Sequence, residues 1–153
     1  MENLNWERIG ARSRLAVSEG ADDDKLFLPY GAPMQEEARI SAEELKAVLD
    51  HDDDRRPMLV DLCLPRGLPR RTDMLAGASV HAPAALPRWV EQLPPDRPIA
   101  VYCICGFQVS GTAVTELRRR GYDARALVGG ITAWRAIGGE TVPLNTSTYE
   151  ELA

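Results

Sequence analysis

Cysteine and histidine are scarce in this sequence. Only three of its 153 residues are cysteine and two are histidine. An odd number of cysteines without framework spacing does not predict a set of disulfides, and it is typical of a reducing compartment. The Cys-x-Cys pair and the two distant histidines lack the spacing of zinc ligands, so we expect no metal and no cofactor.

Long apolar runs and an excess of positive charge are also missing. No span of about 20 apolar residues, the length that crosses a bilayer, is present. Residues 1–8 lack the basic start and apolar core of a secretory signal. The formal net charge is −5, and no basic stretch is interleaved with aromatics as in nucleic-acid binders. We therefore expect a cytoplasmic protein that binds neither membranes nor nucleic acid.

The length of the chain suits one domain with a sizeable core. Residues 1–37 are mostly polar around a short apolar segment, so we expect an N-terminal extension that is partly disordered. Residues 38–144 form the expected single domain. Residues 145–153 are expected to be a C-terminal tail.

Strand patterns alternate with helix patterns through the expected domain. Ser41 and Glu44 form a capping box that predicts a helix start, and Ile40 can pack on Leu45 as a hydrophobic staple. Strands are expected at residues 58–62, 99–102 and 124–128, with a short strand from Val80, and further helices at 84–93, after 110 and at 132–137. This alternation predicts an α/β fold with a mostly parallel central sheet that helices flank on both faces.

Cys103 directly follows the apolar run 99–102, which is typical of a strand buried on both faces. Ser110 is a suitable N-cap for the next helix. A short loop that begins with a thiol therefore leads to a helix N-terminus, where free amides and the helix dipole favour an anion. Such a field also favours the thiolate form of a cysteine. Cys103 lies at the carboxyl end of its strand, where sheets of this kind bind ligands.

Several motifs around this loop occur in the order of a known family. They are Tyr-Cys-x-x-Gly at 102–106, Leu-Arg-Arg-Arg-Gly-Tyr at 117–122, Leu-Val-Gly-Gly-Ile-x-x-Trp at 127–134, Leu-Val-Asp-Leu at 59–62 and Leu-Ala-Gly-Ala at 75–78. Over about residues 39–144 the chain resembles a rhodanese-like domain of the sulfurtransferase family. The resemblance implies that Cys103 accepts sulfane sulfur as a persulfide. Thiosulfate exemplifies the implied small anionic donor, and the implied acceptor is a thiol, a cyanide-like nucleophile or a protein.

The resemblance also implies an anion-binding loop after the nucleophile. Its expected members are Ile104, Cys105, Gly106, Phe107, Gln108, Val109 and Ser110. Many sulfurtransferases place an arginine or another polar residue at the position of Gln108, and here Val109 is interposed before Ser110. The loop is therefore one residue longer than is common.

The longer loop is similar to two other branches of this fold. Phosphatases and arsenate reductases have such a loop for tetrahedral oxyanions, but they place an arginine at the position of Val109. The form Cys-x-x-Gly-x-x-Val-Ser is more similar to rhodanese-like domains that accompany bacterial chromate-resistance proteins, as are residues 73–78 and the helix with Trp89.

Two residues outside the loop are expected to support it. Asp61 is interpreted as a brace for loops at the sheet edge rather than as an acid. Cys63 is either a structural cysteine or a third thiol near the site. Cys105 is either a resolving thiol or a small loop residue.

Other polar residues are expected to be at the surface. The basic run 118–120 is interpreted as the solvated last turn of a helix. His81 is expected on the surface or in a loop.

Three functions remain open at this stage. A sulfurtransferase that uses Cys103 is our main interpretation. The alternatives are an oxyanion reductase or phosphatase-like enzyme acting on chromate, arsenate or phosphate-type substrates, and a non-catalytic anion sensor or binding module in chromate resistance. Fold alone does not choose among them.

Overall fold

Five parallel strands form the central sheet of the computed structural model, which describes residues 36–51, 56–104 and 108–150. In spatial order they are β1 (Arg39–Ile40), β6 (Ala124–Leu127), β5 (Ile99–Tyr102), β2 (Met58–Leu62) and β4 (Ser79–His81). Every neighbouring pair is parallel. The predicted α/β fold is therefore confirmed. The central strand β5 is fully buried along its length, as its apolar run predicted.

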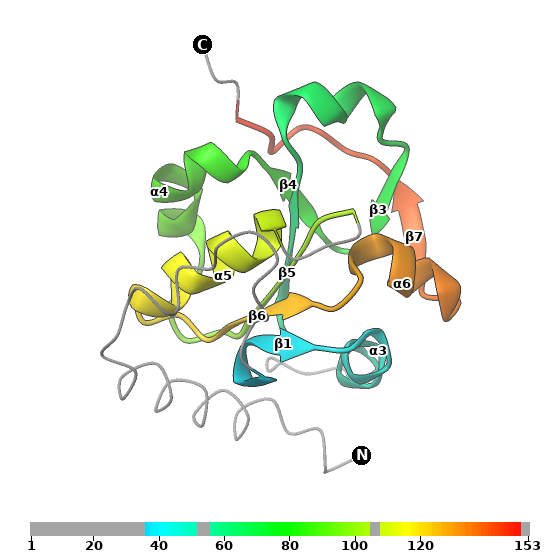
Figure 1. Cartoon of the computed structure of the whole chain (residues 1–153), viewed down its shortest axis with the longest axis horizontal. Coiled ribbons are helices and arrows are strands. Elements are labelled where there is room, and N and C mark those ends of the chain that lie inside the picture. The colour runs from blue at the N-terminus through cyan, green and yellow to red at the C-terminus, as the bar shows by residue number, and fades with distance from the viewer. Residues whose placement is uncertain (1–35, 52–55, 105–107, 151–153) are drawn as a thin grey trace.

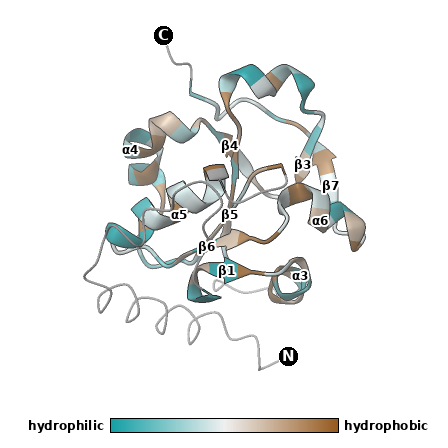
Figure 2. Cartoon of the chain, in the orientation of Figure 1, coloured by the Kyte–Doolittle hydropathy of each residue, from teal (hydrophilic) through white to brown (hydrophobic). Residues whose placement is uncertain are grey.

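Helices cover both faces of this sheet (Figure 1). One face packs against α3 (Ala42–Leu49) and α6 (Gly130–Ala136), and the other against α4 (Leu86–Trp89) and α5 (Gln108–Arg119). Side chains of a strand alternate between the two faces, so Val101 packs on the α5 side and Tyr102 on the α6 side. Figure 2 shows brown, hydrophobic stretches along the central strands and more teal on the outer helices.

The predicted start of α3 is confirmed. Ser41 is its N-cap and accepts a hydrogen bond from the Glu44 amide at 3.0 Å, while the Ser41 amide donates to the Glu44 carboxylate at 2.9 Å. The single helix predicted over 84–93 is wrong. The segment comprises η4 (Pro83–Ala85), α4 and η5 (Val90–Gln92). Pro87 has no N–H to donate, so the segment adopts short turns of changing type.

A second, two-stranded sheet lies beside the first. β3 (Asp73–Leu75) pairs antiparallel with β7 (Thr141–Pro143), and η3 (Pro65–Arg70) precedes β3. We expected residues 124–128 to be the last strand, and β7 corrects that expectation. Strands of three residues are too short for a sequence period to reveal, and each forms only because the other lies beside it.

The segment after β7 covers β4, the outer strand of the sheet. The Thr148 hydroxyl accepts from the Val80 amide at 3.2 Å and donates to the Val80 carbonyl at 2.9 Å. His81 is buried, pairs with Glu150 at 2.7 Å and stacks on Trp89 with ring centroids 5.0 Å apart. The expected surface position of His81 is therefore wrong, because the C-terminal segment covers it.

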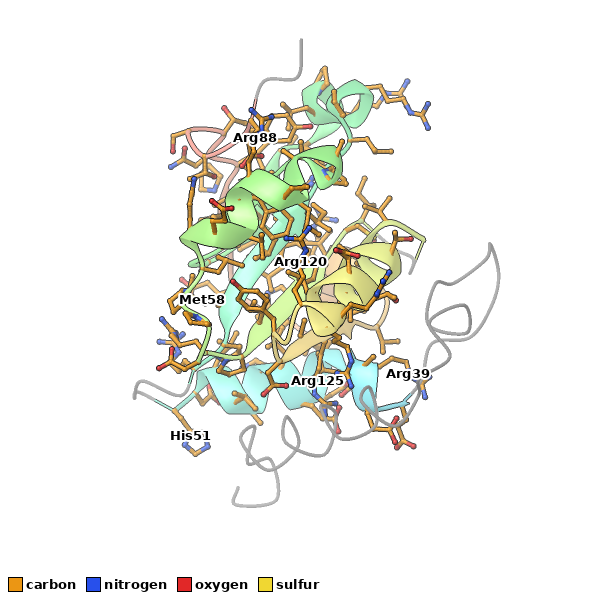
Figure 3. All side chains as sticks on the ribbon, turned by 90° about the vertical axis from the view of Figure 1, so that its left-hand side faces the viewer. Arg39, His51, Met58, Arg88, Arg120 and Arg125 are labelled. Atoms are coloured by element: carbon orange, nitrogen blue, oxygen red, sulfur yellow. The ribbon has the colours of Figure 1, made fainter. Side chains whose placement is uncertain are left out.

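Arginines lie around the amino-terminal ends of the strands, and this edge of the sheet faces the viewer in Figure 3. Arg118 is buried, unlike the solvated residue that we predicted, and donates to the carbonyls of Glu37 and Ala124 at 3.3 and 3.1 Å. Arg125 donates to the Arg39 carbonyl at 2.9 Å, and burial lowers the pKa of Arg125 to about 10. The side chain of Arg120 is 38% exposed. The buried arginines fasten η2 (Glu36–Ala38) and β1 to the sheet.

Within the described residues, no helix has the length and apolar character needed to cross a membrane.

Candidate active site

Cys103 is the first residue after β5, at the carboxyl edge of the sheet, and its side chain is partly exposed. Its Sγ lies 3.8 Å from the hydroxyl of Ser110, which is buried in the first turn of α5. The helix begins at Gln108, so Ser110 is inside the helix and the expected N-cap role is wrong. The geometry places a thiol next to the N-terminal turn of a 12-residue helix.

The first turn of α6 binds the backbone of Cys103 and of the residue after it. The amides of Ile131 and Thr132 donate to the carbonyls of Cys103 and Ile104 at 3.0 and 3.1 Å. The Thr132 hydroxyl also donates to the Ile104 carbonyl, at 3.0 Å. Because a trans peptide is planar, the Ile104 N–H points opposite to the Cys103 carbonyl and therefore away from α6. α6 thus sets the direction of the first amide after Cys103.

Gly130 makes this close approach possible. Its φ is +59°, and a Cβ at this position would lie 2.3 Å from the Cys103 carbonyl oxygen and 2.6 Å from that of Ile104. Real side chains do not come so close to backbone atoms, so a glycine is required here. The second glycine of the Gly-Gly motif at 129–130 is therefore in contact with the backbone of Cys103 and Ile104.

Asp61 forms a buried ion pair at the neighbouring strand end. Its two carboxylate oxygens accept from the guanidinium of Arg71 at 2.9 and 2.6 Å, and both side chains are almost fully buried. Arg71 also donates to the Asp73 carbonyl at 3.0 Å, and the hydrogen bond from Arg71 to Asp61 raises the pKa of Arg71. Asp61 therefore braces the η3–β3 segment. Our sequence analysis missed Arg71, because three arginines in this segment look alike.

Tyr102 and Cys63 border the same ion pair. The Tyr102 hydroxyl accepts from the Leu75 amide at 2.9 Å, and burial together with the charge of Asp61 raises the pKa of Tyr102. Cys63 is buried and its Sγ donates to the Leu64 carbonyl at 3.4 Å. Burial raises the pKa of the Cys63 thiol, and the nearby Arg71 offsets this only in part. This environment favours a neutral thiol at Cys63.

The expected anion-binding loop is only partly visible. Cys105, Gly106 and Phe107 lie outside the described residues, as does the side chain of Gln108. Ile104 is exposed, Val109 is half-buried and Ser110 is buried. The assignment of these seven residues to an anion site stays a prediction.

Comparison with known proteins bears on this arrangement. Residues 73–137 match the family model described as a rhodanese-like domain. The chain contains a rhodanese-like domain. The matched region includes Cys103, α5 and α6, and it begins after Asp61. No curated protein matches the sequence.

Solved structures resemble this chain over about two thirds of the length of the chain. A rhodanese-related protein from Thermoplasma volcanium is 24% identical with a TM-score of 0.57, over 68% of this chain and 96% of that one. The Alr3790 protein from Anabaena sp. is 28% identical with a TM-score of 0.57, over 69% and 82%. A protein of unknown function from Rhodopseudomonas palustris, described as a possible tyrosine phosphatase, is 21% identical with a TM-score of 0.55, over 67% and 82%.

Proposed function

We propose that this protein is a rhodanese-type sulfurtransferase that carries sulfane sulfur as a persulfide on Cys103. One observation carries the proposal: the Cys103 thiol stands at the carboxyl edge of a parallel sheet, 3.8 Å from Ser110 in the first turn of α5. A helix N-terminus stabilises a nearby anion through its free amides and its dipole. The site is therefore suited to a thiolate nucleophile and to an anionic sulfur donor.

The proposed reaction has two sulfur transfers. The Cys103 thiolate attacks the outer sulfur of thiosulfate, the S–S bond to the sulfonate group breaks, and sulfite leaves with the electron pair. An acceptor such as cyanide or a thiolate then attacks the outer sulfur of the persulfide. The S–S bond to Cys103 breaks and the Cys103 thiolate is restored, so no external oxidant or reductant is needed.

Neighbouring groups have distinct positioning roles in this proposal. The Ser110 hydroxyl accepts a hydrogen bond from the Cys103 thiol, and by rotating it can donate to the thiolate. The amides of Ile131 and Thr132 in α6 hold the carbonyls of Cys103 and Ile104. The buried pair of Asp61 and Arg71 holds the neighbouring loop and is not assigned a proton-transfer role.

The direct test is the intact mass after incubation with thiosulfate. We expect one added sulfur on the wild-type protein, located on Cys103 by peptide mapping, and none on Cys103→Ser. Thiocyanate formation from thiosulfate and cyanide should disappear in the variant, because a hydroxyl does not form a persulfide, while circular dichroism remains unchanged. Wild-type turnover by folded Cys103→Ser would contradict the proposal.

A phosphatase-like activity is the second candidate. Its support is the longer loop in the sequence and the similarity to the Rhodopseudomonas palustris protein described as a possible tyrosine phosphatase. Hydrolysis of p-nitrophenyl phosphate that depends on Cys103, without sulfur uptake from thiosulfate, would favour this candidate. Binding of chromate or phosphate without either reaction would favour an anion sensor.

A further inference from the structure

Exposed apolar side chains are concentrated at the edge of the sheet that holds Cys103. In the described part of the chain, the large hydrophobic residues that are exposed are Leu64 at 39%, Ile104 at 47% and Val128 at 38%. Each follows the carboxyl end of a different strand: β2, β5 and β6, which are neighbours in the sheet. Single apolar residues scattered over a surface need no explanation, but this set is not scattered.

Strand register places these residues around the thiol. Val101 of β5 is level with Ala126 of β6 and with Val60 of β2. Two residues further along these strands, Cys103 is therefore level with Val128 and with the last residue of β2. Leu64 lies two residues beyond that end of β2. The nucleophile thus has an exposed apolar residue on each side and one directly after it.

Positive charge adjoins this apolar set. Arg66 and Arg70 are exposed on η3, which begins directly after Leu64, and neither forms an ion pair with another described residue. Two nearby carboxylates are already paired with arginines: Asp61 with Arg71 and Asp73 with Arg135. The edge around Cys103 is therefore apolar and cationic, although the chain as a whole has a net charge of −5.

We infer that Leu64, Arg66, Arg70, Ile104 and Val128 form an acceptor rim, which docks a protein whose reactive cysteine is surrounded by apolar and acidic side chains. The inference rests on the proposed function and names its acceptor class. Thiosulfate and cyanide have no apolar surface to bury, so they do not account for these exposed side chains. The surface of a partner protein can cover these apolar side chains, and the two arginines favour a partner surface that is acidic.

The transfer on this rim is an exchange of one sulfur atom. The acceptor thiolate attacks the outer sulfur of the Cys103 persulfide. The S–S bond to Cys103 breaks, Cys103 leaves as a thiolate, and the acceptor cysteine retains the persulfide. The number of S–S bonds is unchanged.

Short peptides with one cysteine test the selectivity of the rim. The first peptide places two leucines and two glutamates around the cysteine, the second replaces the glutamates by lysines, and the third replaces the leucines by serines. With protein first loaded by thiosulfate, we expect the first peptide to gain sulfur about tenfold faster than either of the others at low salt, because complementary charge mainly raises association rates. The advantage over the lysine peptide should shrink as salt screens the charges. Equal rates for the three peptides would overturn the inference.

Variants of the rim provide the matched comparison. In Arg66→Glu/Arg70→Glu and in Leu64→Asn/Val128→Thr, the ratio of the peptide rate to the cyanide rate should fall about fivefold or more. Arg120→Glu reverses one arginine at the opposite edge of the sheet, as Figure 3 shows, and should leave this ratio unchanged. An equal fall in Arg120→Glu would mean that net charge, not the rim, controls the transfer. Dimerisation that Leu64→Asn/Val128→Thr abolishes would assign the rim to a second copy of the chain and overturn the inference.

A second assay separates failure of the rim from failure of sulfur transfer. The same peptides, supplied as mixed disulfides with thionitrobenzoate, react when the Cys103 thiolate attacks the peptide sulfur and thionitrobenzoate leaves. If thiosulfate never loads Cys103, the proposed function fails, yet a faster reaction of the acidic, apolar peptide, mapped to Cys103, would still support the rim. No preference among the mixed disulfides would overturn it.

Discussion

Two cysteines at neighbouring strand ends have different surroundings. Cys103 is partly exposed and next to the first turn of α5, whereas Cys63 is buried beside the pair of Asp61 and Arg71. The main consequence of burial at Cys63 is a raised pKa. A thiolate at Cys63 would have to be desolvated, so the structure favours the structural interpretation of Cys63, and the proposed chemistry is assigned to Cys103.

We predict that Cys63 in the folded protein is alkylated by iodoacetamide at least tenfold more slowly than in the urea-unfolded chain, because only the thiolate reacts.

The raised pKa of Cys63 also predicts a pH dependence of stability, because the folded protein binds the thiol proton more tightly than the unfolded chain does. The associated stability is present below the unfolded pKa of about 8.5 and is lost as pH rises through the folded value. Cys63→Ala should therefore lose less stability than the wild type between neutral and alkaline pH. Equal losses in urea unfolding would contradict this prediction.

The pair of Asp61 and Arg71 allows a second prediction at this scale. Arg71→Ala leaves a buried carboxylate without its partner, which should lower the free energy of unfolding by about 3–5 kcal/mol. The double variant Asp61→Leu/Arg71→Met removes both charges and should recover most of that loss. Urea unfolding monitored by tryptophan fluorescence measures both. If the free energy of unfolding of Arg71→Ala falls by much less than this, the ion pair contributes little to stability.

At the scale of elements, α6 supports the backbone of Cys103 and Ile104. Its first amides and the Thr132 hydroxyl hold the carbonyls of Cys103 and Ile104, and Gly130 permits the contact. A short helix that follows the neighbouring strand β6 thereby controls the backbone after β5. The contact explains the glycine at the first position of α6.

We predict that Gly130→Ala lowers kcat/KM for thiosulfate by about 10- to 100-fold, because small displacements of a reactive group have effects of this size. The control is Gly77→Ala. Gly77 also has a positive φ, of +87°, but a Cβ there meets no atom within 4 Å. Both variants therefore contain backbone strain, and only Gly130→Ala displaces the loop. Equal losses of activity in two folded variants would contradict the role of α6.

At the scale of the whole molecule, the C-terminal segment joins the outer strand to the loop that follows β2. Thr148 and Glu150 contact β4, and the Tyr149 hydroxyl donates to the Cys63 carbonyl at 2.6 Å. An exposed edge strand is a site for association with other chains, and this segment covers it. The last part of the described chain therefore belongs to the stability of the sheet.

We predict that deletion of residues 145–153 lowers the free energy of unfolding by roughly 2–4 kcal/mol, since several hydrogen bonds of about 1 kcal/mol each are lost. The truncated protein should also aggregate more readily through the exposed edge of β4. Thermal unfolding and size-exclusion chromatography measure the two effects. Ser147→Ala, which alters an exposed side chain of the same segment, is the control and should match the wild type. A truncated protein as stable as the wild type would contradict the prediction.

Local features of this protein were readable from the sequence alone. The capping box of Ser41 and Glu44, the buried strand 99–102 and the thiol that follows it are each encoded within about ten residues. They depend on helix capping, on the pattern of apolar residues and on where the strand ends, and all of these involve residues close together in the sequence. The sequence thereby determined the α/β fold and the position of Cys103 at the end of a buried strand.

Contacts between distant residues were decided only by the tertiary structure. Asp61 pairs with Arg71 and not with Arg66 or Arg70, and His81 pairs with Glu150, which lies 69 residues further along the chain. No local pattern distinguishes these partners, because burial of a charged group depends on which segments the fold brings over it. The approach of α6 to the nucleophile loop and the gathering of exposed apolar side chains around Cys103 have the same origin. Both follow from the adjacency of β2, β5 and β6 in the sheet, which brings together strand ends that lie far apart along the chain.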